Sequence, residues 1–272
     1  MGLFNKKNCA ICNEKVGLLG GLKLKDGHLC KECKNKLSPF FTERKESTIE
    51  DVKKQLEYRE ENYKLLDKLE INKIYGEFGV ILIDEKNKKF VAVRDTGGGL
   101  FSNPKKVTSI DDVKDQNPDI IDLKDVEDVE VKIIQTNREE KQTVNGQQVS
   151  YNPKHYTYMI GFNIIIKVKH PYIKEMRIDI KSGTVQIYNE GLRKQDDYIA
   201  GFVKDKLGLK RVENKAVHYD NLTIHNLVEK AMQVMPDYSY GFKCSLKNYD
   251  RIKEYAYYLA LCDEIRSSLL NK

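Results

Sequence analysis

The stretch Cys9-Ala-Ile-Cys12, followed after residues 13–29 by Cys30-Lys-Glu-Cys33, organises this chain. Each Cys-x-x-Cys pair lets two sulfurs reach one ion from a single turn. The residues between the pairs bring the second pair back to complete a tetrahedron of thiolates, the usual form of a closed structural zinc site. We therefore predict that one zinc ion is bound by Cys9, Cys12, Cys30 and Cys33.

Disulfides and reactive thiols are the alternative uses of these cysteines. The start of the chain, Met1 to Lys7, lacks an apolar core long enough for an export signal. We therefore expect a cytoplasmic protein, in which disulfides rarely persist. His28 could replace one sulfur as a ligand. With four cysteines available, we expect it to lie beside the site or at the surface.

Composition describes a soluble chain with a heavily charged surface. It has 272 residues, 40% of them hydrophobic and 32% charged, which allows about two domains. No apolar run approaches the roughly 18–20 residues of a membrane span. The formal net charge is +6, and the excess of lysine is concentrated around the cysteine pairs. This excess indicates an acidic partner for the N-terminal module, and mutation of Lys31, Lys34 and Lys36 would test nucleic acid as that partner.

A linker helix is predicted over residues 47–71. Ser47-Thr-Ile-Glu50 has the form of a capping box, which starts a helix. The apolar residues that follow have heptad-like spacing, interrupted by Arg59. We expect this helix to pack on a neighbouring domain, because the run is too short for a dimeric coiled coil. Its apolar positions are Ile49, Val52, Leu56, Tyr63 and Leu66.

From Tyr75 the apolar residues follow a period of two, which is typical of strands. About seven strands fall between residues 75 and 188, the clearest from Tyr156 to Lys169, and hairpins or loops join them. Asn145-Gly146 is the strongest hairpin signal in the chain. This pattern predicts one antiparallel barrel or sandwich.

The remaining residues have helical character. Residues 197–207 and 222–235 read as two helices within an insertion at about 189–246. Residues 247–270 read as a long closing helix that turns an apolar face, Cys262 included, toward the β-domain. That face contains Ile252, Tyr255, Leu259, Cys262, Ile265 and Leu269.

The first forty residues resemble a bacterial zinc-ribbon family named domain of unknown function 4428. The resemblance rests on the cysteine pairs, on Val16-Gly-Leu-Leu-Gly20 and on Lys23-Leu-Lys-Asp-Gly-His28. It implies zinc binding and no established activity. Members often continue with a helix and a β-rich domain carrying an Ile-Asp-Glu hairpin, matched here by Ile83 to Phe90 with spacing shifted by one. The β-domain with its closing helix looks like a pleckstrin-homology-like barrel.

The predicted fold is α+β and multidomain. A zinc-ribbon or treble-clef-like head spans residues 1–42, the linker helix spans 47–71, and a pleckstrin-homology-like β-domain with the helical insertion spans 72–272. A head of this size is too small to be stable through burial alone. We therefore expect chelation of the metal to unfold residues 1–40 and to leave the β-domain folded.

The other reactive residues favour structural roles. Gly97-Gly-Gly99 lacks the Gly-Lys-Ser/Thr of a phosphate-binding loop. Cys262 lies on an apolar stripe, as a core thiol does, and Cys244 stands apart. The basic residues of the first hairpin fit a solubilising surface better than a lipid site. These basic residues are Lys86, Lys88, Lys89 and Arg94. The histidines are scattered along the chain and do not form a metal-binding pattern; they are His155, His170, His218 and His225.

The sequence thus predicts a non-enzymatic interaction or scaffold module with a structural zinc site and a protein partner. It indicates no catalytic residue, no organic cofactor and no small-molecule substrate, and a membrane lipid is not an expected partner. Two alternatives remain. One is a nucleic-acid-binding protein that uses the basic head, and the other is an enzyme whose site lies in the insertion at 189–246.

Overall fold

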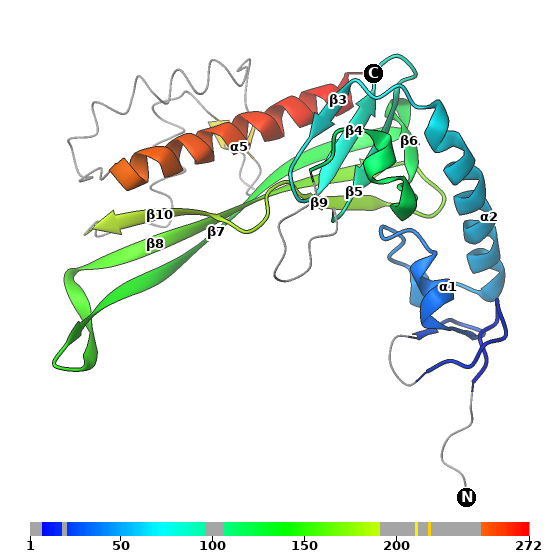
Figure 1. Cartoon of the computed structure of the whole chain (residues 1–272), viewed down its shortest axis with the longest axis horizontal. Helices are drawn as coiled ribbons and strands as arrows, with labels where there is room; N and C mark the ends of the chain where they lie inside the picture. Colours follow the sequence, from blue (N-terminus) through cyan, green and yellow to red (C-terminus); the bar gives the residue numbers. More distant parts are fainter. Residues whose placement is uncertain are drawn as a thin grey trace, which may run out of the picture.

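A small N-terminal head, a helix beside it, two four-stranded β-sheets and a C-terminal helix form the main part of the described structure (Figure 1). The computed structural model describes residues 7–17, 21–95, 106–190, 210–211, 217–218 and 246–271, and all structural statements below refer to them. Among these residues, no helix has the length and apolar character needed to cross a membrane.

The head is built around a short hairpin and one helical turn. Strand β1 (Leu22–Lys23) pairs antiparallel with β2 (His28–Leu29), and helix α1 (Lys31–Asn35) follows directly. Its apolar residues form a small core that includes three of the cysteines and one residue of the next helix. The buried members are Cys9, Leu24, Leu29, Cys30, Cys33, Leu37, Phe41 and Val52.

Helix α2 (Ile49–Leu65) confirms that a helix lies within the predicted range 47–71, with a different cap. The hydroxyl of Thr48 accepts from the backbone N–H of Asp51, and the Thr48 N–H donates to the Asp51 carboxylate at 2.9 Å. The cap therefore lies one residue beyond the predicted Ser47, whose hydroxyl donates to the carbonyl of Glu43 instead.

The buried face of α2 also differs from the predicted apolar stripe. Tyr63 is 41% exposed, whereas Gln55, Arg59 and Asn62 are buried. Burial of the last two is tolerated because each is hydrogen-bonded to the segment before β6. The helix packs on its neighbours as expected, and it runs from the head to the first sheet (Figure 1).

The first sheet has four antiparallel strands in the order β3-β4-β5-β6. They are β3 (Lys73–Tyr75), β4 (Val80–Asp84), β5 (Lys89–Val93) and β6 (Ile120–Asp122). Both faces are buried: Ile81 and Phe90 point into the main core, and Leu82 and Val91 into a smaller one. Short 3-10 turns lie at Arg44–Glu46, Leu66–Lys68, Ile110–Asp112, Lys114–Gln116 and Leu123–Asp125.

The second sheet is built on one long hairpin. Its strands are β7 (Val126–Val144), β8 (Gln147–Val168), β9 (Glu175–Asp179) and β10 (Val185–Glu190). Strand β8 is central, with β7 on one side and both β9 and β10 on the other. The turn is Asn145-Gly146, as predicted, and both residues have positive φ, as a tight hairpin turn requires.

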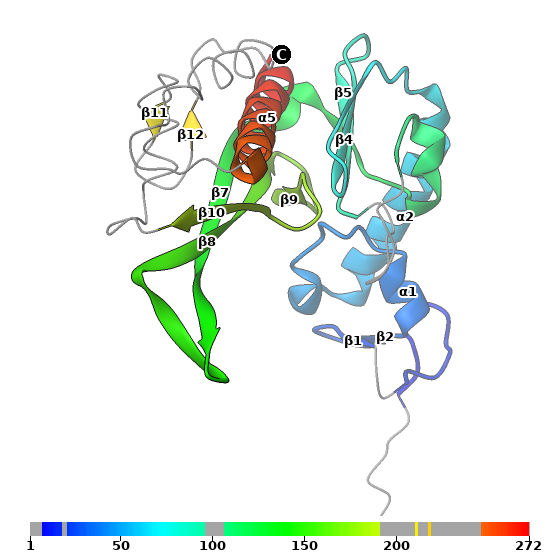
Figure 2. The same ribbon diagram turned by 60° about the vertical axis from the view of Figure 1, so that its left-hand side comes forward.

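The far part of this hairpin extends beyond α5 and the other described strands (Figures 1 and 2). A register shift lies there, because Glu140 pairs with His155 and Lys141 pairs with Ser150. Residues 151–154 of β8 therefore bulge out of the ladder, and Pro153, which has no N–H to donate, lies among them.

The two sheets are joined along one seam. After β3, the N–H groups of Glu77 and Gly79 donate to the carbonyls of Ile180 and Asp179 at 3.0 and 2.8 Å. This close approach requires a residue without a side chain at position 79, because a Cβ there would come within 2.5 Å of Ile178. Residues of both sheets then share the main core.

No closed barrel is present in the described residues, and the predicted barrel is wrong in this respect. The strands form two separate sheets, and neither β7 nor β10 pairs with a strand of the first sheet. The long hairpin carries β7 and β8 past the core, so their far ends cannot close a small barrel. Two antiparallel sheets around a shared core are closer to the sandwich alternative.

Helix α5 (Leu246–Leu270) confirms the predicted closing helix and covers one face of the second sheet (Figure 1). Cys262 is fully buried in the main core, as expected. The predicted helices at 197–207 and 222–235 lie outside the described residues. Between them the structure describes only the antiparallel pair β11 (Lys210–Arg211) and β12 (Val217–His218).

Candidate metal centre

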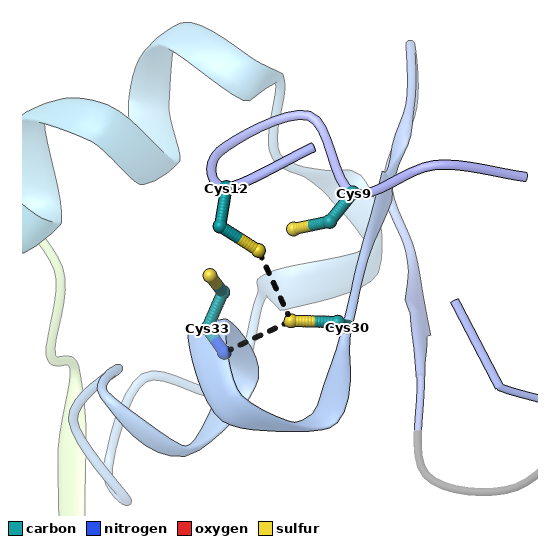
Figure 3. Close-up of side chains that lie close together, drawn as sticks. All are labelled: Cys9, Cys12, Cys30 and Cys33. Atoms are coloured by element: carbon teal, nitrogen blue, oxygen red, sulfur yellow. Dashed lines mark hydrogen bonds between the residues drawn. The ribbon is translucent and has the colours of Figure 1, made fainter. Parts of the chain in front are cut away.

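The four predicted cysteines meet at one point in the head. Their Sγ atoms all lie within 4.8 Å of one another, and those of Cys12 and Cys30 are 3.6 Å apart. In Figure 3 all four sulfurs point toward a common centre. A tetrahedron with Zn–S bonds of about 2.3 Å has edges of about 3.8 Å. The cluster therefore has the donor type of a four-thiolate metal site, and the Cys12–Cys30 separation is close to the edge of a zinc tetrahedron.

The backbone holds the first pair in a tight turn. The N–H of Cys9 donates to the carbonyl of Glu14, and the N–H of Asn13 donates to the carbonyl of Cys9 at 2.9 Å. Asn13 takes a left-handed conformation, φ 61°, which asparagine tolerates better than most residues. The N–H of Ala10 then donates to the carbonyl of His28, which ties this turn to the hairpin before the second pair.

The second pair opens helix α1. Cys30 is the N-cap, and its Sγ accepts from the backbone N–H of Cys33 at 3.4 Å (Figure 3). This bond sets the two sulfurs on the same side of the first helical turn.

Neighbouring sulfurs perturb the titration of Cys9, Cys12 and Cys33. Burial tends to raise the pKa of Cys9, but hydrogen bonds from the backbone of Cys12, Cys30 and Ile11 outweigh it and lower the pKa to about 6. Burial, together with the neighbouring sulfurs, raises the pKa of Cys33. Sulfurs this close together disfavour simultaneous negative charges, and a divalent cation at their centre would relieve this repulsion.

His28 lies beside the cluster without pointing into it. Its Nε2 is 3.0 Å from the Nζ of Lys7, and burial followed by the charges of Lys7 and Lys23 lowers its pKa. Among the described residues, the group of metal-type side chains close enough to hold an ion consists of the four cysteines.

The other residues singled out from the sequence have structural surroundings where they are described. Lys86 pairs with Glu70 on the surface, and Lys89 pairs with Asp122 in a half-buried position. Burial raises the pKa of the Cys262 thiol. Cys244, His225 and Gly97–Gly99 lie outside the described residues, as do the surroundings of the His218 side chain.

Sequence reasoning missed a buried polar junction between the head and the sheets. Asp119 is fully buried just before β6, and its carboxylate accepts from Arg59 Nη1 at 2.9 Å and from Ser38 Oγ at 2.5 Å. The Nε of Arg59 also donates to the carbonyl of Lys36 at 3.2 Å. The one available signal was Arg59, a charge in an otherwise apolar stripe.

One comparison with known proteins supports this description of the head. A family model described as a domain of unknown function, DUF4428, matches residues 7–55. The matched residues contain both cysteine pairs and the first turns of α2, so this part of the chain is similar to that family. The match and the cysteine cluster together fit a zinc-ribbon-like domain at the N-terminus. No curated protein and no solved structure matches the chain.

Proposed function

We propose that the head binds one structural zinc ion through Cys9, Cys12, Cys30 and Cys33. The observation that carries this proposal is the convergence of four sulfurs within 4.8 Å of one another. Four cysteine ligands leave no open position for a substrate, so the ion would fold the head and would not catalyse a reaction. Its free energy of binding would be part of the free energy of folding.

X-ray absorption at the zinc edge of the purified full chain tests the ligand set. We expect four sulfur neighbours at about 2.3 Å. A nitrogen or oxygen neighbour would contradict the closed four-cysteine site. A signal from another metal in its place would contradict the choice of zinc.

We further propose that the chain is a non-enzymatic cytoplasmic module that binds a protein partner. The supporting feature is the end of the β7–β8 hairpin, residues 138–150, which we name the ribbon. Residues 141–148 are all exposed, and the ribbon has no core on either face. Two-stranded ribbons are marginally stable alone, and strand edges are common docking sites for extended peptides.

The charges of the ribbon fit a protein partner better than a nucleic acid. Arg138 pairs with Glu140 at 3.0 Å, and Glu139 pairs with Lys154 at 3.1 Å. Within the ribbon, two cations, Arg138 and Lys141, are matched in number by two carboxylates, Glu139 and Glu140, whereas a phosphate backbone is bound by unbalanced lysine and arginine. The lysines of α1 remain the basis of the second candidate function, nucleic-acid binding by the head.

Two variants separate these functions. Replacing residues 141–150 with Asn-Gly shortens the ribbon, and replacing Lys31, Lys34 and Lys36 with glutamine removes the head cations. We expect a protein partner to be lost with the ribbon variant and kept by the lysine variant. Salt-dependent binding to DNA or RNA that is lost in the lysine variant alone would favour the second function.

A further inference from the structure

The segment that leaves the second cysteine pair is anchored in both the head and the sheets. We name residues 38–44 the connector. Phe40 is buried in the main core shared by the sheets, and Phe41 is buried in the core of the head with Cys33 and Leu37. Two consecutive side chains therefore belong to two different cores, so the connector cannot shift without disturbing both.

Polar contacts fix the connector at its first residue. The hydroxyl of Ser38, fully buried, donates to Asp119 and accepts from the N–H of Phe40 at 3.1 Å. Arg44 turns back on the connector, donating to the carbonyls of Phe41 and Ser38. Ser38 and Asp119 thus hold the head against the start of β6.

Arg59 extends this junction to α1 and α2. Arg59 is 5% exposed, and its guanidinium reaches Asp119, the carbonyl of Gln116 and the carbonyl of Lys36, which lies three residues after Cys33. Breaking a buried ion pair by removing one partner costs several kcal/mol, because the other charge is left uncompensated. The position of α1 is therefore fixed through Arg59 to a buried ion pair whose separation costs several kcal/mol.

An aromatic cluster closes the same junction. The ring of Tyr172, in the turn between β8 and β9, lies 6.1 Å from Phe41 of the connector and 5.8 Å from Tyr58 of α2. His170 lies 5.1 Å from Tyr58. These rings join the connector, α2 and the second sheet.

We infer that metal binding in the head and closure of this junction are coupled, so that loss of the metal releases the head from the sheets. The inference rests on the proposed zinc site. Without the metal, Cys30 and Cys33 lose their fixed positions, and the helical turn that carries Lys36, Ser38 and the connector is no longer held. By linkage, the factor by which the bound metal favours closure of the junction equals the factor by which the closed junction strengthens metal binding. This differs from the sequence-based expectation that the β-domain is indifferent to chelation.

The coupling is tested in the full chain with Ser38→Ala, which removes a hydrogen bond to a carboxylate and no metal ligand. Competition with a chromophoric chelator gives the zinc affinity. We expect affinity about ten- to a hundredfold weaker than in the wild type, the size set by one charge-assisted hydrogen bond. Ser150→Ala, which removes a serine bonded to Glu139 on the ribbon, is the matched control and should leave the affinity unchanged.

Hydrogen exchange of the wild type provides a second readout that needs no variant. The N–H of Ile120 donates to Asn62 at 2.8 Å inside the junction. Chelation should speed exchange at Phe40 and Ile120 and leave Ile164, in the middle of β8, protected. Equal zinc affinity in the wild type and Ser38→Ala, with unchanged exchange at Ile120 on chelation, would overturn the coupling and leave the zinc site standing. A wild type that binds no zinc would overturn both.

Discussion

Arg59 shows at the scale of one residue why a periodic pattern is an incomplete guide. Helical spacing places it among apolar residues, and from the sequence it reads as an interruption. In the structure it is buried, and Asp119, sixty residues away in the chain, neutralises it at 2.9 Å. A single sequence contains no signal that pairs these two residues, because the contact depends on how β6 returns beside α2.

Removal of Arg59 should destabilise the whole chain. Arg59→Met keeps most of the side-chain volume and leaves Asp119 buried without its counter-charge. We expect the free energy of unfolding to fall by about 3–5 kcal/mol in urea titrations. Lys54→Met, which removes an exposed partner of Glu50, should cost less than about 1 kcal/mol. Equal small effects of the two variants would contradict a buried ion pair at the junction.

His170 should make the stability of the junction depend on pH. Burial lowers its pKa, an effect that the nearby Asp119 and Asp125 carboxylates partly offset. Its Nδ1 accepts from the N–H of Tyr172 at 3.2 Å, a bond that only the neutral ring can form. In the unfolded chain, the imidazole of His170 takes up a proton near pH 6.5. The contribution to stability is therefore complete above about pH 6.5 and is lost as the pH falls below it.

Urea unfolding between pH 7 and pH 5 checks this dependence. His170→Phe should flatten the decline in stability that the wild type shows as the pH falls. His155→Phe is the control, since His155 is stacked on Tyr151 on the hairpin, away from the junction. If the stability of His170→Phe fell as steeply with pH as that of the wild type, groups other than His170 would cause the pH dependence.

At the scale of elements, sequence patterns predict a helix or a turn correctly where the residues of that segment alone determine its structure. The Asn145-Gly146 turn, α2 and the closing helix were all predicted near their observed places. The capping residue of α2 is Thr48 and not the predicted Ser47. Both residues have a hydroxyl group, and the sequence alone does not show which of them caps the helix. The length of β7 and β8 was underestimated, because the exposed ribbon is polar and lacks apolar alternation.

Gly79 provides a test of the seam between the sheets. A methyl group there would come within 2.5 Å of Ile178 and 2.8 Å of the carbonyl of Asp179, so either the seam or the strand must move. We expect Gly79→Ala to lower the free energy of unfolding by about 1–3 kcal/mol. Gly161→Ala is the control, because the nearest atom to its added methyl group would be 4.0 Å away, and its effect should stay within about 0.5 kcal/mol.

At the scale of the whole molecule, strand patterns predicted antiparallel sheets but not how they close. Alternation shows which side of each strand is buried, and this was correct for residues such as Tyr158, Ile160 and Phe162. It does not show which strand edges meet. That depends on the seam at Glu77 and Gly79, a contact between segments about a hundred residues apart.

Deletion of α5 should expose the main core. Its buried face includes Leu259, Cys262 and Ile265, all packed against residues of the two sheets. A chain that ends at residue 245 should therefore aggregate, or bind hydrophobic dyes when kept dilute. Size-exclusion chromatography of the two chains makes the comparison. A truncated chain that stays monomeric and unfolds cooperatively would contradict the closing role of the helix.

The zinc content of purified variants tests the central claim most directly. Elemental analysis should find one zinc per wild-type chain. Cys30→Ser should lose most of it, because three thiolates leave the tetrahedron incomplete. His28→Ala and Cys262→Ser should keep it, since the ring of His28 points to Lys7 and Cys262 is in the main core. A wild-type head that is folded without metal, or a His28→Ala chain that loses zinc as fully as Cys30→Ser, would contradict the account.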